Sequence, residues 1–248
     1  MDMTGRTILV TGASSGIGRE TSVLLGRLGA KVVMVARNEA RLAAALSQTD
    51  GGPHLTEAYD LGQADEIPAW LKSITYQSGP LDGIVHCAGA QITRPLRNLS
   101  YQDVEPLMRV HVGASIALAR GFRQKGVCRQ GGSLVFLASV MGVVGEGGRI
   151  AYSAAKGALI GLVRSLAVEL ARENIRVNCI SPAFVQTPMM EEMKDTLTSE
   201  QMASIEAKHL LGFGTPLDVA YAAAYLIADT GRWITGSNLV LDGGYTAT

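Results

Sequence analysis

The sequence carries little charge and few aromatic side chains, and its charges cancel. Charged residues make up 18% of the 248 residues and aromatic residues 5%, and 22 basic side chains balance 22 acidic ones. This balance argues against nucleic acid as a partner, because proteins that bind it carry a basic stripe or patch. Apolar residues still reach 47%, and most are Ala, Val, Leu and Ile. That composition favours a parallel sheet buried under helices on both faces.

Cysteine and long apolar runs are scarce as well. The three cysteines, Cys87, Cys128 and Cys179, are far apart and odd in number, which excludes a disulfide framework and a zinc-ligand spacing. We interpret them as free thiols, which fits a reducing cytoplasm. No apolar run approaches the roughly 18–20 residues of a membrane span, and the run at 8–10 is too short for a signal-peptide core. We therefore expect a cytoplasmic protein with no membrane partner and no resident metal.

Strand-like and helix-like segments alternate along the whole chain. This alternation predicts βαβ units with right-handed crossovers, and hence a doubly wound parallel sheet of the Rossmann type with helices on both faces. With no linker or repeat visible, we expect one domain over 1–248. The expected strands are 8–10, 32–35, 55–59, 83–85, 134–137, 175–180 and 239–241, and the expected helices are 17–28, 39–46, 64–76, 100–124, 152–171 and 216–228.

One segment, 184–211, breaks the alternation. It contains Met189, Met190, Met193 and Met202, and it follows the carboxyl end of a strand, where open α/β sheets bind ligands. We interpret it as a flap over a substrate site. The alternative is a surface helix whose methionines fill gaps in the packing.

A glycine-rich loop follows the first strand and opens the first helix. Its pattern is G-x-x-x-G-x-G rather than the more widespread G-x-G-x-x-G. Glycines let backbone N–H groups approach a pyrophosphate, and the helix N-terminus adds partial positive charge. The predicted phosphate-binding residues are Gly12, Ser14, Ser15, Gly16, Ile17 and Gly18.

The end of the second strand indicates which dinucleotide is bound. An acidic residue there would bind the ribose 2′-hydroxyl of NAD, but the sequence has Ala36-Arg37-Asn38. Arg37 offers a forked cation for a 2′-phosphate, and Arg41 lies one helical turn further on. We therefore expect NADP(H) as the cofactor.

Tyr152 and Lys156 are four residues apart, on one face of a predicted helix. A free phenol has a pKa near 10, and a neighbouring ammonium together with an oxidised nicotinamide would lower it. Such a phenol can protonate an alkoxide as it forms, or accept the proton of an alcohol. Lys156 can also hold a ribose hydroxyl. Ser139, at the end of the fifth strand, can bind and orient the substrate oxygen.

With the glycine loop, Ser139, Tyr152 and Lys156 in place, the whole sequence resembles the short-chain dehydrogenase/reductase family, and within it the 3-oxoacyl reductases. The segments Asn178 to Pro182 and Ile234-Thr235-Gly236 also resemble the family pattern. The resemblance implies hydride transfer between NADP(H) and a carbonyl or secondary alcohol, for example a 3-oxoacyl thioester, and commonly a homotetramer. It also implies further cofactor-binding residues: Asp60 by the adenine, Ala88 and Gly89 by the ribose, and Val185 and Thr187 by the nicotinamide, together with Leu61, Pro182, Tyr152 and Lys156.

Two histidines depart from the family pattern. His111 stands where the family has a catalytic Asn, and His86 opens the segment that is usually Asn-Asn-Ala-Gly. Because the relay role of that Asn rests largely on its backbone carbonyl, we predict that His111 can still serve. The alternative is a nucleotide-binding, redox-sensing protein without turnover. An epimerase or dehydratase would usually need a longer chain with a C-terminal lobe. Arg94 and Arg97 are candidates for an anionic substrate group or for surface charge.

Overall fold

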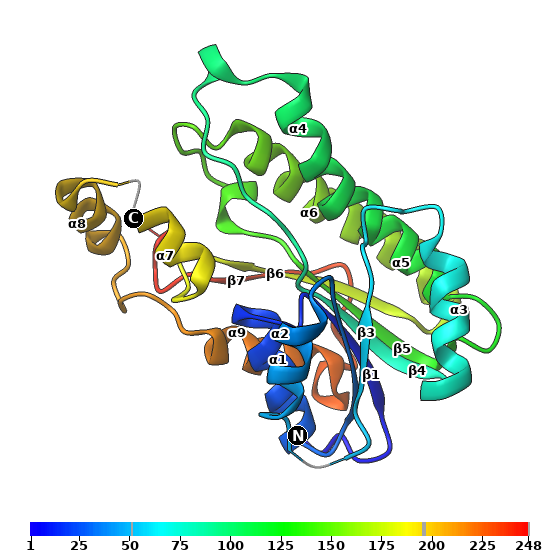
Figure 1. Cartoon of the computed structure of the whole chain (residues 1–248). Helices are drawn as coiled ribbons and strands as arrows, with labels where there is room; N and C mark the ends of the chain where they lie inside the picture. The colour runs from blue at the N-terminus through cyan, green and yellow to red at the C-terminus, as the bar shows by residue number, and fades with distance from the viewer. Residues whose placement is uncertain (51, 195–196, 248) are drawn as a thin grey trace.

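The computed structural model describes residues 1–50, 52–194 and 197–247, and its core is one parallel sheet of seven strands (Figure 1). The strand order is β3-β2-β1-β4-β5-β6-β7, and every neighbouring pair is parallel. This confirms the predicted doubly wound sheet. The strands are β1 (Thr7–Thr11), β2 (Lys31–Ala36), β3 (Leu55–Ala58), β4 (Leu81–His86), β5 (Cys128–Leu137), β6 (Arg176–Pro182) and β7 (Asn238–Leu241).

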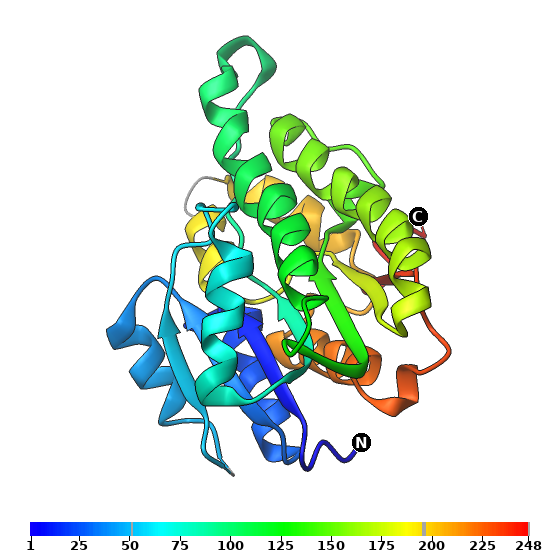
Figure 2. The same ribbon diagram turned by 90° about the vertical axis from the view of Figure 1, so that its right-hand side faces the viewer.

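Helices cover both faces of the sheet (Figures 1 and 2). On one face, α1 (Gly16–Arg27), α2 (Glu39–Leu46) and α9 (Pro216–Ile227) share a buried apolar cluster with the strands. On the other, α3 (Ile67–Ser78), α5 (Ala114–Phe122) and α6 (Ile150–Leu170) share a second cluster. The sheet is therefore buried on both sides, as the Val- and Ile-rich strands require.

The expected continuous helix at 100–124 is interrupted. It consists of α4 (Tyr101–Met108), a π-helical turn at Arg109–Gly113, and α5. Two side chains bond to carbonyls within that turn. Ser115 Oγ donates to the His111 carbonyl at 2.6 Å, and His86 Nε2 lies 3.2 Å from the Val110 carbonyl. Single π-helical turns of this kind are frequent at functional sites.

Segment 184–211 contains two helices, α7 (Pro188–Lys194) and α8 (Ser199–Ala207). In Figure 1 both lie beyond the carboxyl ends of the strands, away from the helices that cover the sheet. Met190 and Met193 of α7 are buried, whereas Met189 is 38% exposed. In the part of the chain that the structure describes, no helix is long and apolar enough to cross a membrane.

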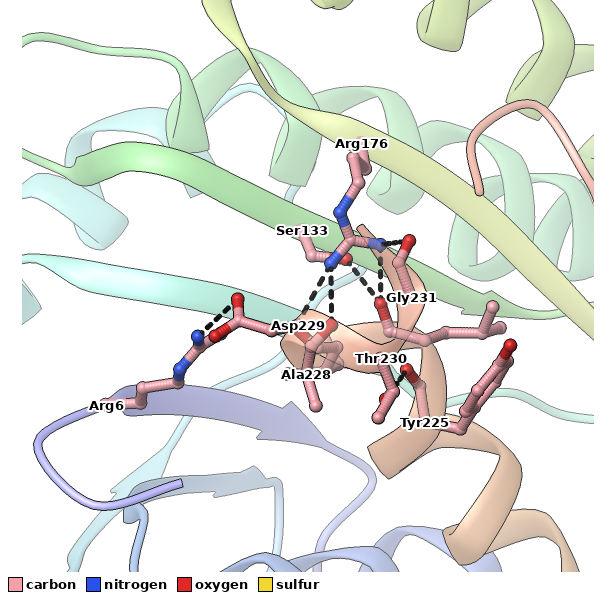
Figure 3. A network of polar contacts seen from close by, with 10 residues as sticks. Arg6, Ser133, Arg176, Tyr225, Ala228, Asp229, Thr230 and Gly231 are labelled. Atoms are coloured by element: carbon pink, nitrogen blue, oxygen red, sulfur yellow. Dashed lines mark hydrogen bonds and ion pairs between the residues drawn. The ribbon is translucent and has the colours of Figure 1, made fainter. Parts of the chain in front are cut away.

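At the amino end of the sheet, Arg176 anchors the end of α9 (Figure 3). Its guanidinium donates to the carbonyls of Leu226 at 2.6 Å and Gly231 at 2.9 Å, and at longer range to those of Ile227 and Ala228. Leu226 and Ile227 are the last residues of α9, where a helix leaves carbonyls without intrahelical partners, so a cation there is favourable.

Candidate active site

A groove of about 740 Å³ runs along the carboxyl ends of β1, β2 and β4. The strand order reverses between β1 and β4, and open α/β sheets bind ligands at this switch point. Twelve residues that the sequence assigned to the cofactor line this groove: Gly12, Ser14, Ser15, Gly16, Ile17, Gly18, Arg37, Asp60, Leu61, Ala88, Gly89 and Thr187.

The glycine loop has the geometry of an anion site. Gly12 and Gly16 have φ values of 67° and 51°, which favour glycine, and a Cβ on Gly12 would lie 2.8 Å from the Ala88 nitrogen. Ser15 precedes α1 without capping it through its side chain, and the first turn contains no acidic residue. The helix N-terminus is therefore suited to a phosphate.

The far end of the groove carries exposed Arg37 and Arg41. The backbone N–H of Arg41 donates to Asn38 Oδ1 at 2.9 Å, which caps α2 and fixes the loop that holds Arg37. Within the described ranges, Arg37 has no acidic partner closer than 4 Å. Asp60 Oδ1 instead accepts from the Gly62 N–H at 2.9 Å. The groove thus fits a dinucleotide with a negatively charged group at the adenosine end.

A second cavity, of about 160 Å³, adjoins the groove. The two cavities share six lining residues: Ile17, Cys87, Gly89, Ala90, Thr187 and Met189. The second cavity also brings together all four predicted catalytic residues and the remaining predicted nicotinamide contacts: His111, Ser139, Tyr152, Lys156, Pro182 and Val185. A ligand seated in the groove would therefore reach the candidate catalytic groups.

The catalytic side chains come from the end of β5 and the first turns of α6. The Tyr152 hydroxyl faces the Ser139 side chain, and Lys156 Nζ lies 5.5 Å from the centre of the Tyr152 ring. Ser139 Oγ accepts from the Met141 N–H at 3.2 Å, and Lys156 Nζ donates to the Leu137 carbonyl at 2.6 Å. These contacts to the end of β5 hold both polar groups beside the phenol.

Burial controls the ionisation of this site. It raises the pKa of Tyr152, and the Ser139 hydrogen bond and the charge of Arg149 offset only part of that rise. Burial also lowers the pKa of Lys156 to about 7. In the protein without its cofactor, desolvation of the phenolate dominates the Tyr152 pKa. The expected lowering requires an oxidised nicotinamide beside Lys156 and stays a prediction. Tyr152 is a protonated acid at neutral pH.

The two unexpected histidines hold the π-helical turn against β4. His111 Nε2 lies 2.8 Å from the Ala90 carbonyl, and the space for its ring exists because residue 89 is glycine. His86 Nδ1 lies 2.7 Å from Thr11 Oγ1, while its Nε2 faces the Val110 carbonyl. Burial lowers the pKa of His111 to about 2 and that of His86 to about 4. Both rings are therefore neutral at neutral pH.

Sequence reasoning missed three polar residues in the same cavity: Gln91, Glu146 and Arg149. Arg149 is only 6% exposed, and it is the N-cap residue of α6, three positions before Tyr152. That spacing was a signal present in the sequence. Arg94 and Arg97 line neither cavity, and Arg94 pairs with Asp103 at 3.3 Å. Among the described residues, no cluster of three metal-ligating side chains occurs.

A dinucleotide groove joined to a tyrosine–lysine–serine cavity defines an oxidoreductase, and comparisons with known proteins agree. The family model described as enoyl-(acyl carrier protein) reductase matches residues 12–246. The 3-oxoacyl-acyl-carrier-protein reductase FabG of Rickettsia prowazekii is 33% identical over 245 residues, which cover 98% of each chain. The corresponding human reductase is 32% identical over 235 residues, which cover 95% of each chain.

Solved structures show the same relationship. A candidate NAD(P)-dependent gluconate 5-dehydrogenase from Beutenbergia cavernae, solved with bound NADP, has a TM-score of 0.92 and 29% identity, covering 100% of this chain and 99% of that one. A short-chain dehydrogenase/reductase from Mycobacterium ulcerans has the same TM-score at 28% identity, covering 100% and 92%. The chain belongs to the short-chain dehydrogenase/reductase family. It is an oxidoreductase of this family.

Proposed function

We propose that this enzyme reduces a ketone with NADPH, and that the ketone is a 3-oxoacyl thioester or a similar compact carbonyl compound. The observation that carries the proposal is that Ser139, Tyr152 and Lys156 share a cavity continuous with the dinucleotide groove. The curated relatives named above are 3-oxoacyl reductases. The protonated state of Tyr152 favours reduction, because the acid form of the residue must protonate the new alkoxide.

Each residue then has a defined task. Ser139 Oγ donates to the carbonyl oxygen and aligns it with the Tyr152 hydroxyl, which gives up its proton as the alkoxide forms. Lys156 supplies positive charge beside the phenolate that remains. When bound, NADPH supplies the hydride that the carbonyl carbon accepts. The glycine loop and the N-terminus of α1 would hold its pyrophosphate, and Arg37 its 2′-phosphate.

The direct experiment follows NADPH absorbance with a panel of ketones, 3-oxoacyl thioesters and keto sugars. Oxidation of NADPH by at least one compound is expected, and the initial rate with each defines the preferred substrate. If purified protein that binds NADPH oxidises it with no member of the panel, ketone reduction is wrong.

The second candidate function is binding of a nucleotide without turnover, and the observation that favours it is His111 in place of the usual Asn. The backbone carbonyl of His111 argues against this function. It accepts one hydrogen bond from Ser115 and keeps a second lone pair, so it can still serve in the proton relay. We expect measurable turnover from the wild type and from His111→Asn. If the wild type is inactive and His111→Asn gains NADPH oxidation, the histidine has disabled the site and the protein is a binder.

We further infer a cytoplasmic homotetramer in which segment 184–211 acts as the substrate flap. One side of α6 supports the assembly, because Ala154, Gly161 and Val168 are exposed there and small residues allow another helix to approach. For the flap, Met189, Met190 and Met193 of α7 line the reaction cavity. Light scattering that gave the 26.1 kDa mass of one chain at micromolar concentration would contradict assembly.

A further inference from the structure

The reaction cavity has one polar wall that the chemistry at Tyr152 does not use. Glu146, Arg149 and Gln91 form it, and apolar side chains such as Met190 and Val140 line the same cavity. Arg149 Nη1 donates to Gln91 Oε1 at 3.1 Å, and Gln91 Nε2 donates to the Met189 carbonyl at 3.2 Å. This polar wall is thus tied to the first residues of α7 and holds a fixed position beside the catalytic helix.

Glu146 brings an unsatisfied acceptor to this wall. Its Oε2 is buried and has no hydrogen-bond partner among the described residues. The nearest cationic atom is Arg149 Nε at 3.5 Å, an ion pair too long for a good hydrogen bond. A buried carboxylate oxygen without a donor is unfavourable, so the site gains when a ligand supplies one.

Arg149 brings underused donors to the same wall. Its Nη2 donates to the Met193 thioether sulfur at 2.6 Å, and a thioether is a weak acceptor compared with oxygen. Among residues 1–50, 52–194 and 197–247, its oxygen partners are Gln91 Oε1 and the more distant Glu146 carboxylate. A ligand oxygen would therefore be a better acceptor than the sulfur that Nη2 now contacts.

A hydroxyl group meets both needs at once, because it donates through its hydrogen and accepts through its oxygen. A hydrocarbon chain meets neither and would leave Glu146 Oε2 buried without a partner. We propose that Glu146 and Arg149 form a hydroxyl-recognition site and that the preferred substrate is a compact ketone with a hydroxyl group near the carbonyl. The cavity of about 160 Å³ suits a compound of this size. The inference rests on the proposed ketone reduction and narrows its substrate class.

The test compares ketones of equal size in which hydroxyl replaces methyl. Hydroxyacetone and butanone differ by one such replacement, and dihydroxyacetone and diethyl ketone differ by two. The readout is the ratio of kcat/KM within each pair, measured from NADPH oxidation. Hydrogen bonds to charged groups are each worth a factor of about 10–100 in binding, so the wild type is expected to prefer the hydroxylated ketone by about that ratio.

Two variants test whether Glu146 and Arg149 cause the preference for the hydroxylated ketone. Glu146→Gln keeps the shape and removes the charge, and Arg149→Met keeps an unbranched side chain and removes the donors. Each is expected to lower the ratio about tenfold, mainly through KM of the hydroxylated ketone. Glu169→Gln and Arg172→Met, both exposed and outside the two cavities, serve as matched controls and should keep the wild-type ratio. Thermal unfolding and NADPH binding verify that each variant is folded, and Glu146→Gln suffices if Arg149→Met does not fold.

Several outcomes overturn the inference. A wild-type ratio near one within both pairs would show that the hydroxyl is not recognised while leaving ketone reduction intact. A high ratio that neither Glu146→Gln nor Arg149→Met lowers would place recognition elsewhere in the cavity. A strong preference for an acetoacetyl thioester over every hydroxylated ketone would also contradict it. Failure to reduce any ketone would remove the proposed function, and this inference with it.

Discussion

The two ends of the parallel sheet differ in how their polar groups are paired. At the amino end, Arg176 donates to four carbonyls, Arg6 pairs with Asp229 at 2.7 Å, and the Thr7 N–H donates to Asp82 at 2.7 Å. At the carboxyl end, burial displaces the pKa values of several titratable groups, and one carboxylate oxygen has no hydrogen bond. These groups include His86, His111, Tyr152 and Lys156. The polar contacts at the amino end stabilise the fold, whereas the carboxyl end holds side chains in protonation states that favour catalysis.

The largest expected effect is the loss of turnover when the Tyr152 hydroxyl is removed. Tyr152→Phe keeps the ring packing and removes the proton, so turnover should fall by about 10²–10⁴-fold. NADPH affinity and thermal stability should change little. The measurement is kcat in a steady-state assay, with a titration of NADPH fluorescence as the control. Turnover close to the wild-type value would sink the assignment of Tyr152 as the acid.

A second effect concerns acid stability. His111 has a folded pKa of about 2 against an ordinary value of 6.5, so below pH 6.5 the unfolded chain binds a proton that the folded chain does not. Stability therefore falls with decreasing pH, by about 1.4 kcal/mol per pH unit for this group. His111→Asn should remove that part of the slope. Urea unfolding at several pH values between 6.5 and 4 measures it, and equal slopes for the two proteins would contradict the buried neutral ring.

A third effect concerns cofactor choice. Charge-assisted contacts to a phosphate are worth about 1.5–3 kcal/mol, so Arg37→Met should weaken NADPH roughly 10–100-fold and NADH little. Isothermal titration with both cofactors gives the two affinities. Equal losses for NADPH and NADH would mean that Arg37 does not read the 2′-phosphate.

The smallest effect should come from the amino end. Arg176→Met removes the donors to the end of α9 and should lower the free energy of unfolding by about 1–3 kcal/mol. That corresponds to roughly 2–4 °C in Tm per kcal/mol for a chain of this size. The kcat of the folded variant should match the wild type. Exposed Arg172→Met is the control for stability. A loss of kcat as large as that of Tyr152→Phe would break the distinction between the two ends.

Much of the fold follows from local pattern. The short Val- and Ile-rich runs became strands, and the helical segments between them became crossovers, because burial on both sheet faces leaves few other arrangements. The cavity residues Ser139, Tyr152 and Lys156 were also predictable. Each carries a side chain suited to proton transfer and lies at the carboxyl end of the sheet or at the start of the helix that follows.

Other features depend on contacts between segments far apart in the sequence. The π-helical turn is held by His86 from another strand, and no periodicity within 100–124 reports that contact. The displacement of the Tyr152 pKa depends on how deeply the folded chain buries the ring. The pairing of Glu146 with Arg149 looks like an ordinary surface contact at three-residue spacing until the structure places both in the cavity.

The π-helical turn also changes the rotational phase of the helix that contains it. A π-helical turn holds one residue more than an α-helical turn, and one residue corresponds to about 100° of rotation in an α-helix. The two halves can therefore turn their apolar sides in different directions. Leu107 of α4 packs with Ala151 and Ala155 of α6, whereas α5 packs on α3. The extra residue that carries His111 to the active site thus also lets one long helix pack against two separate neighbours.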